Sequence, residues 1–447
     1  MIPDEGLRVA IIGGGAGGMA AASRIKKLRP EWVVDVFEKT NYVSHAPCGI
    51  PFYLSGIVES VDDLCAYDVN YFRERRGINV HINSEVVEVR DGELEVVEKG
   101  ERRVYEWDRL VFATGARGRG LDIGCHRVDG VVCVGSIEEA PLVREMARKH
   151  SRVVVVGSGY MGVEIADALS REKRITVIEQ GSHPLPSYDQ EIAEVLMRFM
   201  SQKVDLRINE QVIELRGNER VEKVVTDKNE YRADLVIVAA GVEPNVELAR
   251  DFGVRLGKTG AIEVDEHLET SRKGVYAVGD CAETRNVITE KPDWIPLAAP
   301  ANKMGYVAGS NIAGNEMIFP GALRCQLTSF YDMEIGKAGL SEKEALRAGF
   351  DAVSVTITSR SRASYIPGGG NITVRMVADS ESRRVLGVQA IGSGVAKRIY
   401  ASSALLYKKA YVEDFFFADF PFYPPKSPVW DPLVIAARNL FRKMGIS

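Results

Sequence analysis

Residues Arg8 to Gly18 read RVAIIGGGAGG, and this stretch decides the fold. An apolar run leads directly into a glycine-rich turn and then into an alanine- and methionine-rich segment, a pattern that predicts strand, turn and helix. In such a unit the first glycine makes the turn, the second lets the backbone approach a diphosphate, and the third lets the helix pack on the strand. The stretch therefore predicts a dinucleotide-binding unit.

A second copy of this pattern follows later in the chain. Val153 to Val156 reads as a buried strand, residues 157–162 (GSGYMG) as the turn, and Val163 to Leu169 as the beginning of a helix. One glycine motif alone is weak evidence, because glycine turns between a strand and a helix serve many purposes. Two motifs in the same context predict two dinucleotide sites.

An acidic residue follows the second strand of each copy. Glu38 comes after the run Val33 to Phe37, and Glu179 comes after Ile175 to Ile178. A carboxylate at this place accepts hydrogen bonds from an adenosine ribose. Glu179 also favours NADH, because it would repel a 2′-phosphate, while the nearby basic side chains of residues 173, 174 and 183 keep NADPH open.

Length and composition indicate a globular protein of several domains. The chain has 447 residues, 45% hydrophobic and 27% charged, and ordinary domains have about 100–200 residues. Its net charge of −5 arises from interleaved acids and bases, so no nucleic-acid partner is expected. No leader-like segment and no run of about 18 apolar residues occurs, so we expect a cytoplasmic protein without membrane contact.

The six cysteines show neither a C-x-x-C pair nor a metal-ligand spacing with histidine, so neither a disulfide set nor a metal site is expected. They are Cys48, Cys65, Cys125, Cys133, Cys281 and Cys325. Cys48 stands apart because it lies between Pro47 and Gly49 in a turn that leads into a helix, where a helix start stabilises a thiolate. Cys65 is the nearest conceivable resolving partner, and we do not expect it to act as one.

Three further strand ends complete the pattern: Leu110 to Gly115 (LVFATG), Leu235 to Gly241 (LVIVAAG), and a strand ending in Gly279-Asp280. This order of motifs resembles that of the pyridine nucleotide-disulfide oxidoreductases. The resemblance implies an α/β chain with two Rossmann-like dinucleotide-binding domains, the FAD domain being split by an inserted NAD(P) domain, plus a C-terminal α+β dimerisation domain. The implied segments are 1–114 and 246–324 for FAD, 115–245 for NAD(P), and 325–447 for dimerisation.

By this resemblance the first glycine motif holds FAD, the second holds NADH or NADPH, and Asp280 hydrogen-bonds the ribityl chain of the flavin. Tyr160 and Glu164 would gate and position the nicotinamide. The expected cofactor-binding residues are Gly13, Gly15, Ala16, Gly17, Gly18, Glu38, Lys39, Ala113, Thr114, Gly115, Gly157, Gly159, Tyr160, Met161, Gly162, Glu164, Glu179, Gly241, Gly279 and Asp280.

The C-x4-C pair of the best-known disulfide reductases is missing, and the corresponding region reads SHAPCGIPFY, residues 44–53. A single cysteine here resembles the branch of coenzyme A-disulfide reductase, NADH oxidase and NADH peroxidase. The string APCGIPF looks closest to coenzyme A-disulfide reductases and to archaeal enzymes that reduce CoA persulfides, polysulfide or sulfur. In the peroxidase and water-forming oxidase branch a histidine normally occupies the position of Ala16, so its absence argues against peroxide chemistry.

The resemblance also implies a homodimer in which the C-terminal domain carries tyrosines into the partner's site. Tyr365 matches the first of these, whereas the second aligns best with Phe422, with Tyr423 one residue later. The expected catalytic residues are therefore Cys48, Tyr365 and Tyr423. Coenzyme A, as substrate or bound ligand, would contact Ser44, Arg24, Lys27 and Arg76, although Pro47 stands where an asparagine is common.

The expected activity is reduction of coenzyme A disulfide, CoA persulfide or polysulfide by NAD(P)H, through FAD and Cys48. Two alternatives stay open. One is an NADH oxidase that forms hydrogen peroxide, with oxygen meeting the reduced flavin directly. The other is a partner-docking electron-transfer flavoprotein, although those relatives lack a flavin-side cysteine.

Overall fold

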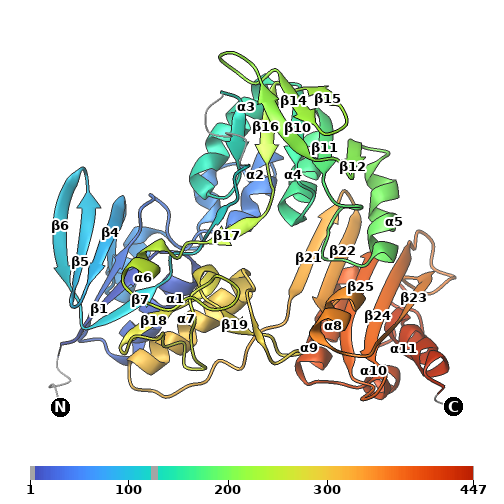
Figure 1. The fold of residues 1–447 in the computed structure, drawn as a ribbon. Coiled ribbons are helices and arrows are strands. Elements are labelled where there is room, and N and C mark those ends of the chain that lie inside the picture. Colours follow the sequence, from blue (N-terminus) through green and yellow to red (C-terminus); the bar gives the residue numbers. More distant parts are fainter. Residues whose placement is uncertain (1–5, 122–128, 446–447) are drawn as a thin grey trace.

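The computed structural model describes residues 6–121 and 129–445, so Cys125 lies outside the described residues. Figure 1 shows three groups of strands, with the N-terminal sheet at the left, a second sheet at the top and the C-terminal sheet at the right. Among the described residues, no helix is both long enough and apolar enough to cross a membrane.

The first sheet is parallel, and β1 lies at its centre with all residues after Arg8 buried. Helix α1 (Ala16–Leu28) follows β1 and packs along α7 (Ala298–Ile312). One edge strand, β18, comes from far later in the chain than the others, after all the strands of the second sheet. The spatial order is β18 (Val275–Ala277), β7 (Arg109–Phe112), β1 (Arg8–Ile12), β2 (Val33–Phe37) and β3 (Asn79–His81).

The second sheet repeats the first strand for strand, with α4 (Tyr160–Ser170) following its central strand as α1 follows β1. Its order is β12 (Asp205–Ile208), β11 (Arg174–Glu179), β10 (Arg152–Val156), β16 (Leu235–Val238) and β9 (Val131–Cys133). The predicted duplication is therefore confirmed, and Glu179 is the last residue of its strand instead of following it.

The repeat also extends to a feature that the sequence did not reveal. Each unit carries a three-stranded antiparallel sheet, inserted between β3 and β7 in the first unit and between β12 and β16 in the second. In the first unit these strands are β4 (Ser84–Arg90), β5 (Glu93–Glu98) and β6 (Glu101–Glu106). In the second they are β13 (Val212–Arg216), β14 (Lys223–Thr226) and β15 (Glu230–Arg232).

The chain crosses between the two units twice, and the two crossings pair as an antiparallel ribbon of β8 (Ala116–Gly118) and β17 (Val242–Pro244). Thr114 donates its hydroxyl to the Asn245 carbonyl at 2.6 Å, and the Asn245 amide donates to the Thr114 carbonyl at 2.8 Å. The remaining elements of these units are α2 (Ile50–Leu54), α3 (Ala140–Lys149), α5 (Gln190–Met200), α6 (Glu247–Asp251), β19 (Thr284–Arg285) and β20 (Pro292–Asp293).

The third sheet is antiparallel, which makes the C-terminal part α+β as expected. Its order is β21 (Cys325–Phe330), β22 (Met333–Gly339), β25 (Val385–Gly392), β24 (Asn371–Asp379) and β23 (Ala352–Arg360). Its helices are α8 (Glu342–Ala348), α9 (Val395–Tyr407), α10 (Val412–Phe417) and α11 (Pro432–Lys443).

A buried ionic network joins the second unit to this C-terminal sheet. Asp189, just before α5, accepts hydrogen bonds from Arg375 at 3.0 Å and from the Gln389 side chain at 2.6 Å. Arg375 also pairs with Glu342 at 2.5 Å, and the buried Lys337 donates to the Ser187 carbonyl at 2.6 Å. Because buried charges are costly without partners, this network holds the segment 187–189 firmly on the sheet.

Replacing Arg375 by methionine should lower the free energy of unfolding by about 3 kcal/mol, because the carboxylates of Asp189 and Glu342 would lose their buried partner. Urea denaturation followed by circular dichroism measures this change. The matched control is Arg383→Met, which breaks the exposed pair with Glu413 and should cost less than about 1 kcal/mol. Equal losses in the two variants would contradict a special role for the network.

Candidate active site

The first glycine turn lies where β1 ends and α1 begins, and two of its glycines leave no room for a side chain. A Cβ on Gly13 would lie 2.1 Å from the Ala113 carbonyl oxygen, and one on Gly18 would lie 2.0 Å from the Gly13 carbonyl oxygen. Gly13 also has φ +110°, which other residues rarely adopt. At Gly15, by contrast, a Cβ would meet no described atom within 4 Å. This open backbone is suited to a diphosphate.

In the second turn, too, two glycines leave no room for a side chain and one lies in open space. A Cβ on Gly157 would lie 2.5 Å from the Ala239 carbonyl oxygen, and one on Gly162 would lie 2.1 Å from the Gly157 carbonyl oxygen. A Cβ on Gly159 would again meet no described atom within 4 Å. Both turns therefore form an anion-binding cradle at a helix start, which fits the diphosphate of a dinucleotide.

The two strand-end glutamates are buried and bonded in the same way. Glu38 accepts backbone N–H groups from Gly14 at 2.8 Å and Thr40 at 2.9 Å. Glu179 accepts N–H groups from Ser158 at 2.9 Å and Gly181 at 2.7 Å. Each carboxylate is thus fixed beside its glycine turn with lone pairs left over, an arrangement that suits ribose hydroxyls.

Asp280 follows β18 at the same carboxyl edge, after Gly279 with φ +76°. Burial raises the pKa of its carboxyl to about 6. Within residues 6–121 and 129–445, its side chain has no hydrogen-bond or ion-pair partner, while its backbone carbonyl accepts the Trp294 indole N–H at 2.7 Å. A half-buried carboxyl without a partner among the described residues fits a hydroxyl-bearing chain such as the ribityl chain of a flavin.

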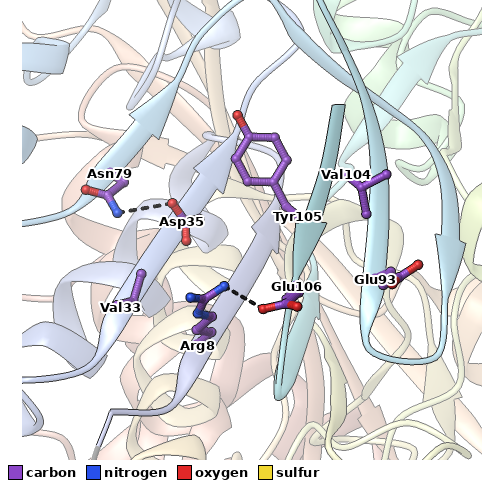
Figure 2. A pocket seen from close by; sticks show the side chains of 8 residues that line it. All are labelled: Arg8, Val33, Asp35, Asn79, Glu93, Val104, Tyr105 and Glu106. Atoms are coloured by element: carbon purple, nitrogen blue, oxygen red, sulfur yellow. Dashed lines mark hydrogen bonds and ion pairs between the residues drawn. The ribbon is translucent and has the colours of Figure 1, made fainter. Parts of the chain in front are cut away.

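A polar hollow near β1 lies at the wrong edge of the sheet for a cofactor. Figure 2 shows Arg8 paired with Glu106 and Asn79 bonded to Asp35 within it. Arg8, Val33 and Asn79 are the first residues of their parallel strands, whereas ligands of such sheets bind beyond the carboxyl ends.

Cys48 lies in a short 3₁₀ turn, Pro47–Gly49, directly before α2. The strand-like segment that leads to it is held by the Ala46 N–H, which donates to the Leu64 carbonyl at 2.9 Å. The side chain is exposed, yet enough protein surrounds it that burial raises the pKa of the thiol. The Glu164 carboxylate raises this pKa further, and the backbone N–H of Cys48 lowers it. The backbone contribution at the helix start thus has the expected sign, but burial and the Glu164 carboxylate outweigh it.

Tyr160 and Glu164 lie on the first turns of α4, and Glu164 is near enough to Cys48 for its charge to act on the thiol. Tyr160 packs with the hydrophobic cluster that contains Ile50 and Tyr53 of α2. Glu164 is half-buried and accepts a hydrogen bond from Thr328 of β21 at 2.7 Å. Burial raises the pKa of Glu164, and the hydrogen bond from Thr328 lowers it.

The two segments with the candidate tyrosines lie side by side on the C-terminal part of the chain. The Ala363 N–H donates to the Pro424 carbonyl at 3.1 Å. Tyr365 is 68% exposed, Tyr423 60% and Phe422 48%, so both candidates for the second aromatic position face outward. Among the described residues, no hydrogen bond joins these side chains to Cys48 of the same chain.

The expected cations are distributed around the first unit. Arg24 donates to the Ser310 hydroxyl at 2.8 Å and stacks on Tyr306 at 4.2 Å. Arg76 donates to the Tyr71 hydroxyl at 2.9 Å, Lys27 is exposed, and Ser44 is half-buried with φ +52°. In the described chain none of the three cations has an acidic partner, so their charge is available for phosphate.

Several contributors in this region carried no sequence signal. Tyr306 and Ser310 contact Arg24 from a distant part of the chain, and only folding brings them there, whereas Tyr71 lies five residues before its partner Arg76. The same holds for Thr328, which lies 164 residues from its partner Glu164.

Known proteins resemble this chain over nearly its whole length. The NAD(P)H sulfur oxidoreductase (CoA-dependent) of Pyrococcus abyssi is 49% identical over 436 residues, which cover 97% of this chain and 98% of the relative. An NADH oxidase of Methanocaldococcus jannaschii is 33% identical over 448 residues, 98% of this chain and 100% of the relative. The solved structure of an NAD-dependent persulfide reductase from A. fulgidus superposes with a TM-score of 0.95 at 35% identity, covering 98% of this chain and 84% of that one.

Two family models account for most of the sequence. The model described as pyridine nucleotide-disulphide oxidoreductase matches residues 7–305. Its dimerisation-domain companion matches residues 325–432. The resemblance inferred from the motifs is thereby confirmed: the chain is an oxidoreductase that belongs to the pyridine nucleotide-disulphide oxidoreductase family.

Proposed function

We propose that this enzyme uses NAD(P)H and FAD to reduce coenzyme A disulfide, CoA persulfide or polysulfide at Cys48. The single observation that carries this proposal is one exposed thiol, placed in the turn before α2 and close enough to α4 for the Glu164 charge to act on it. The names of the Pyrococcus and A. fulgidus relatives support the same substrate class. We propose that the reaction takes place in the cytoplasm.

We propose two groups of residues as the binding sites of FAD and of the nicotinamide nucleotide. Gly13 to Gly18, Glu38, Lys39, Ala113 to Gly115, Gly279 and Asp280 would hold FAD, with segments 1–114 and 246–324 as its domain. Gly157 to Gly162, Glu164, Glu179 and Gly241 would hold the nicotinamide nucleotide, with 115–245 as its domain. When bound, FAD supplies two-electron transfer between the nicotinamide nucleotide and the cysteine sulfur.

Cys48 would act as the nucleophile. Its thiolate attacks one sulfur of the substrate, so a Cys48–substrate disulfide forms and one thiolate leaves. Two electrons and a proton from NAD(P)H then return Cys48 to the thiolate state and release the second thiol, and one proton that comes from solvent protonates the thiolate that left first. The net reaction with coenzyme A disulfide yields two coenzyme A thiols and NAD(P)⁺.

We also propose which residues bind coenzyme A and which segment forms the dimer. Ser44, Arg24, Lys27 and Arg76 would bind the phosphates of coenzyme A, since these cations lack acidic partners in the described chain. The C-terminal segment 325–447 would form a homodimer and bring the exposed Tyr365 and Tyr423 to Cys48 of the other copy. A phenol there would donate a proton to the leaving thiolate.

Replacing Cys48 by serine should lower turnover with coenzyme A disulfide or polysulfide at least about a thousandfold, because the nucleophile is lost. NADH should still reduce the flavin. Anaerobic NADH titration with measurement of released thiol tests both statements, with Cys65→Ser as the matched control. Full disulfide or polysulfide turnover by Cys48→Ser would refute the mechanism. If oxygen were then the faster acceptor, hydrogen peroxide formation would become the favoured function.

Glu164→Gln should move the pH profile of Cys48 alkylation to lower pH, by up to about one unit. The reason is that the negative charge of Glu164 raises the thiol pKa, so removing the charge lowers it and thiolate forms at lower pH. Rates of reaction with iodoacetamide across pH measure the midpoint. Asp167→Asn, one turn further along α4, is the control that should leave the midpoint in place; a shift to higher pH in Glu164→Gln would contradict the assignment.

Glu179→Gln should reduce the preference for NADH over NADPH about tenfold, because the amide no longer repels a 2′-phosphate. The ratio of kcat/KM for the two nucleotides measures this preference. In the matched variant Glu38→Gln the same change is made in the other glycine unit, so the ratio should stay constant even if flavin binding weakens. An unchanged ratio in Glu179→Gln would show that nucleotide choice is made elsewhere.

A further inference from the structure

One buried arginine joins the two segments that carry the candidate tyrosines. Arg398 lies on α9 and is 2% exposed, although a guanidinium is always charged. It donates to the Ser361 carbonyl at 3.1 Å, just before the segment with Tyr365. It also donates to the Asp431 carboxylate at 2.8 Å and 3.1 Å, just after the segment with Tyr423. A single side chain therefore ties both segments to the same helix.

The segment with Tyr365 is a loop that is closed at its base. The Ser361 N–H donates to the Gly370 carbonyl at 3.0 Å, so residues 361–370 begin and end at one place. The carbonyl of Ser361 remains on the other side of this base and accepts the bond from Arg398. The orientation of the whole loop, and with it the direction of Tyr365, is therefore set where Ser361 meets the arginine.

The segment with Tyr423 is a turn that leads to the carboxylate bound by the arginine. The Ser427 hydroxyl accepts the Tyr423 N–H at 3.1 Å and donates to the Pro421 carbonyl at 2.9 Å. At the end of the segment, Asp431 also accepts the Leu433 N–H at 3.0 Å and so caps α11. The turn is thus closed on itself, and Asp431 fixes the point where it returns to the helix layer.

Loss of Arg398 would leave two acceptors unpaired in the interior. Asp431 is 7% exposed, and among the described residues Arg398 is the cation that forms an ion pair with it. Because an unpaired buried charge is costly, the segments would move toward water. They would move together, since the Ala363 N–H donates to the Pro424 carbonyl across them. The arginine therefore determines where two phenol groups stand.

We propose that Arg398 is a positioning residue: it holds Tyr365 and Tyr423 in one fixed arrangement, so that both reach Cys48 of the other copy. The proposal rests on the proposed function, in which these phenols protonate the leaving thiolate. A proton donor acts only within hydrogen-bond reach, and a displacement of about 1 Å lowers a rate about a hundredfold. Arg398 thus acts on a thiol that its own chain does not supply.

The first test follows the NADH-reduced enzyme as it reacts with coenzyme A disulfide or polysulfide, whichever the unmodified enzyme reduces faster, in anaerobic stopped flow. Arg398→Met should slow this reaction about ten- to a hundredfold, whereas flavin reduction by NADH should keep its rate. Arg398→Lys should recover part of the loss, because an ammonium group still pairs with Asp431. An equal loss in both half-reactions would show general damage and would contradict the proposal.

Arg375→Met is the matched control for the loss of a buried ion pair. Arg375 is also buried on the C-terminal sheet, and in the described chain it bonds to neither tyrosine segment. Its replacement should leave the reaction of the reduced enzyme unchanged at temperatures where the variant is folded. If Arg375→Met slowed that reaction as much as Arg398→Met, the special role of Arg398 would be refuted.

Hybrid dimers, purified through two different affinity tags, show on which copy Arg398 acts. In the first hybrid one chain carries Cys48→Ser and the other Arg398→Met, so the intact Cys48 faces tyrosines held by an intact arginine and should react at the normal rate. In the second hybrid one chain carries both changes and the other none, so the intact Cys48 faces displaced tyrosines and should react slowly. The reverse pattern would overturn the proposal. If Arg398→Met does not fold with flavin, Asp431→Asn takes its place in both hybrids.

Replacement of both phenols distinguishes this proposal from the proposed function. Tyr365→Phe combined with Tyr423→Phe should slow the reaction of the reduced enzyme at least about a hundredfold, and adding Arg398→Met should cause no further loss. A normal rate in the double tyrosine variant would refute the tyrosine role in the proposed function, and Arg398 would lose its role with it. A slow tyrosine variant beside normal Arg398→Met and Asp431→Asn would overturn only the positioning role.

Discussion

The close approach of backbone to backbone at the two glycine turns is the constraint on which the rest of the molecule depends. At Gly13 and Gly157 the neighbouring carbonyl oxygen occupies the place where a Cβ would stand, so the helix start is drawn against the adjacent strand. This brings backbone N–H groups to the carboxyl edge of the sheet, where the glutamate of the next strand also ends. The flavin-side cysteine, the two nucleotide cradles and the domain insertion are all arranged around these edges.

Local signals allowed the sequence to predict a large part of this arrangement. Glycine turns, apolar strands and strand-end acids are short-range features, so the strands around Gly13 and Gly157 and the repeat of the unit were predicted correctly. The antiparallel strands β4–β6 and β13–β15 have no such signature, because they are short, partly exposed and charged. They became visible only in the folded chain.

In the candidate active site, too, the sequence predicted what depends on local motifs and missed what depends on tertiary contacts. Cys48, Glu164 and Asp280 were selected from their places in motifs, whereas their electrical surroundings depend on residues distant in sequence. The helix start suggested a stabilised thiolate, but burial and the Glu164 carboxylate act in the opposite direction. Pairings across long sequence separations are decided by tertiary packing, which no local pattern encodes.

The network around Asp189 fixes one loop of the second unit to the C-terminal sheet. The second unit is joined to the C-terminal sheet by buried charges, and to the first unit by buried apolar side chains of α2 as well as by the ribbon, whose Arg117 pairs with Glu243 and Glu247 in an exposed setting. In hydrogen exchange, regions joined by buried contacts open together, while regions joined by exposed ones open separately. Because buried charges join them, we expect the loop before α5 to share its hydrogen-exchange protection with β24 and β25.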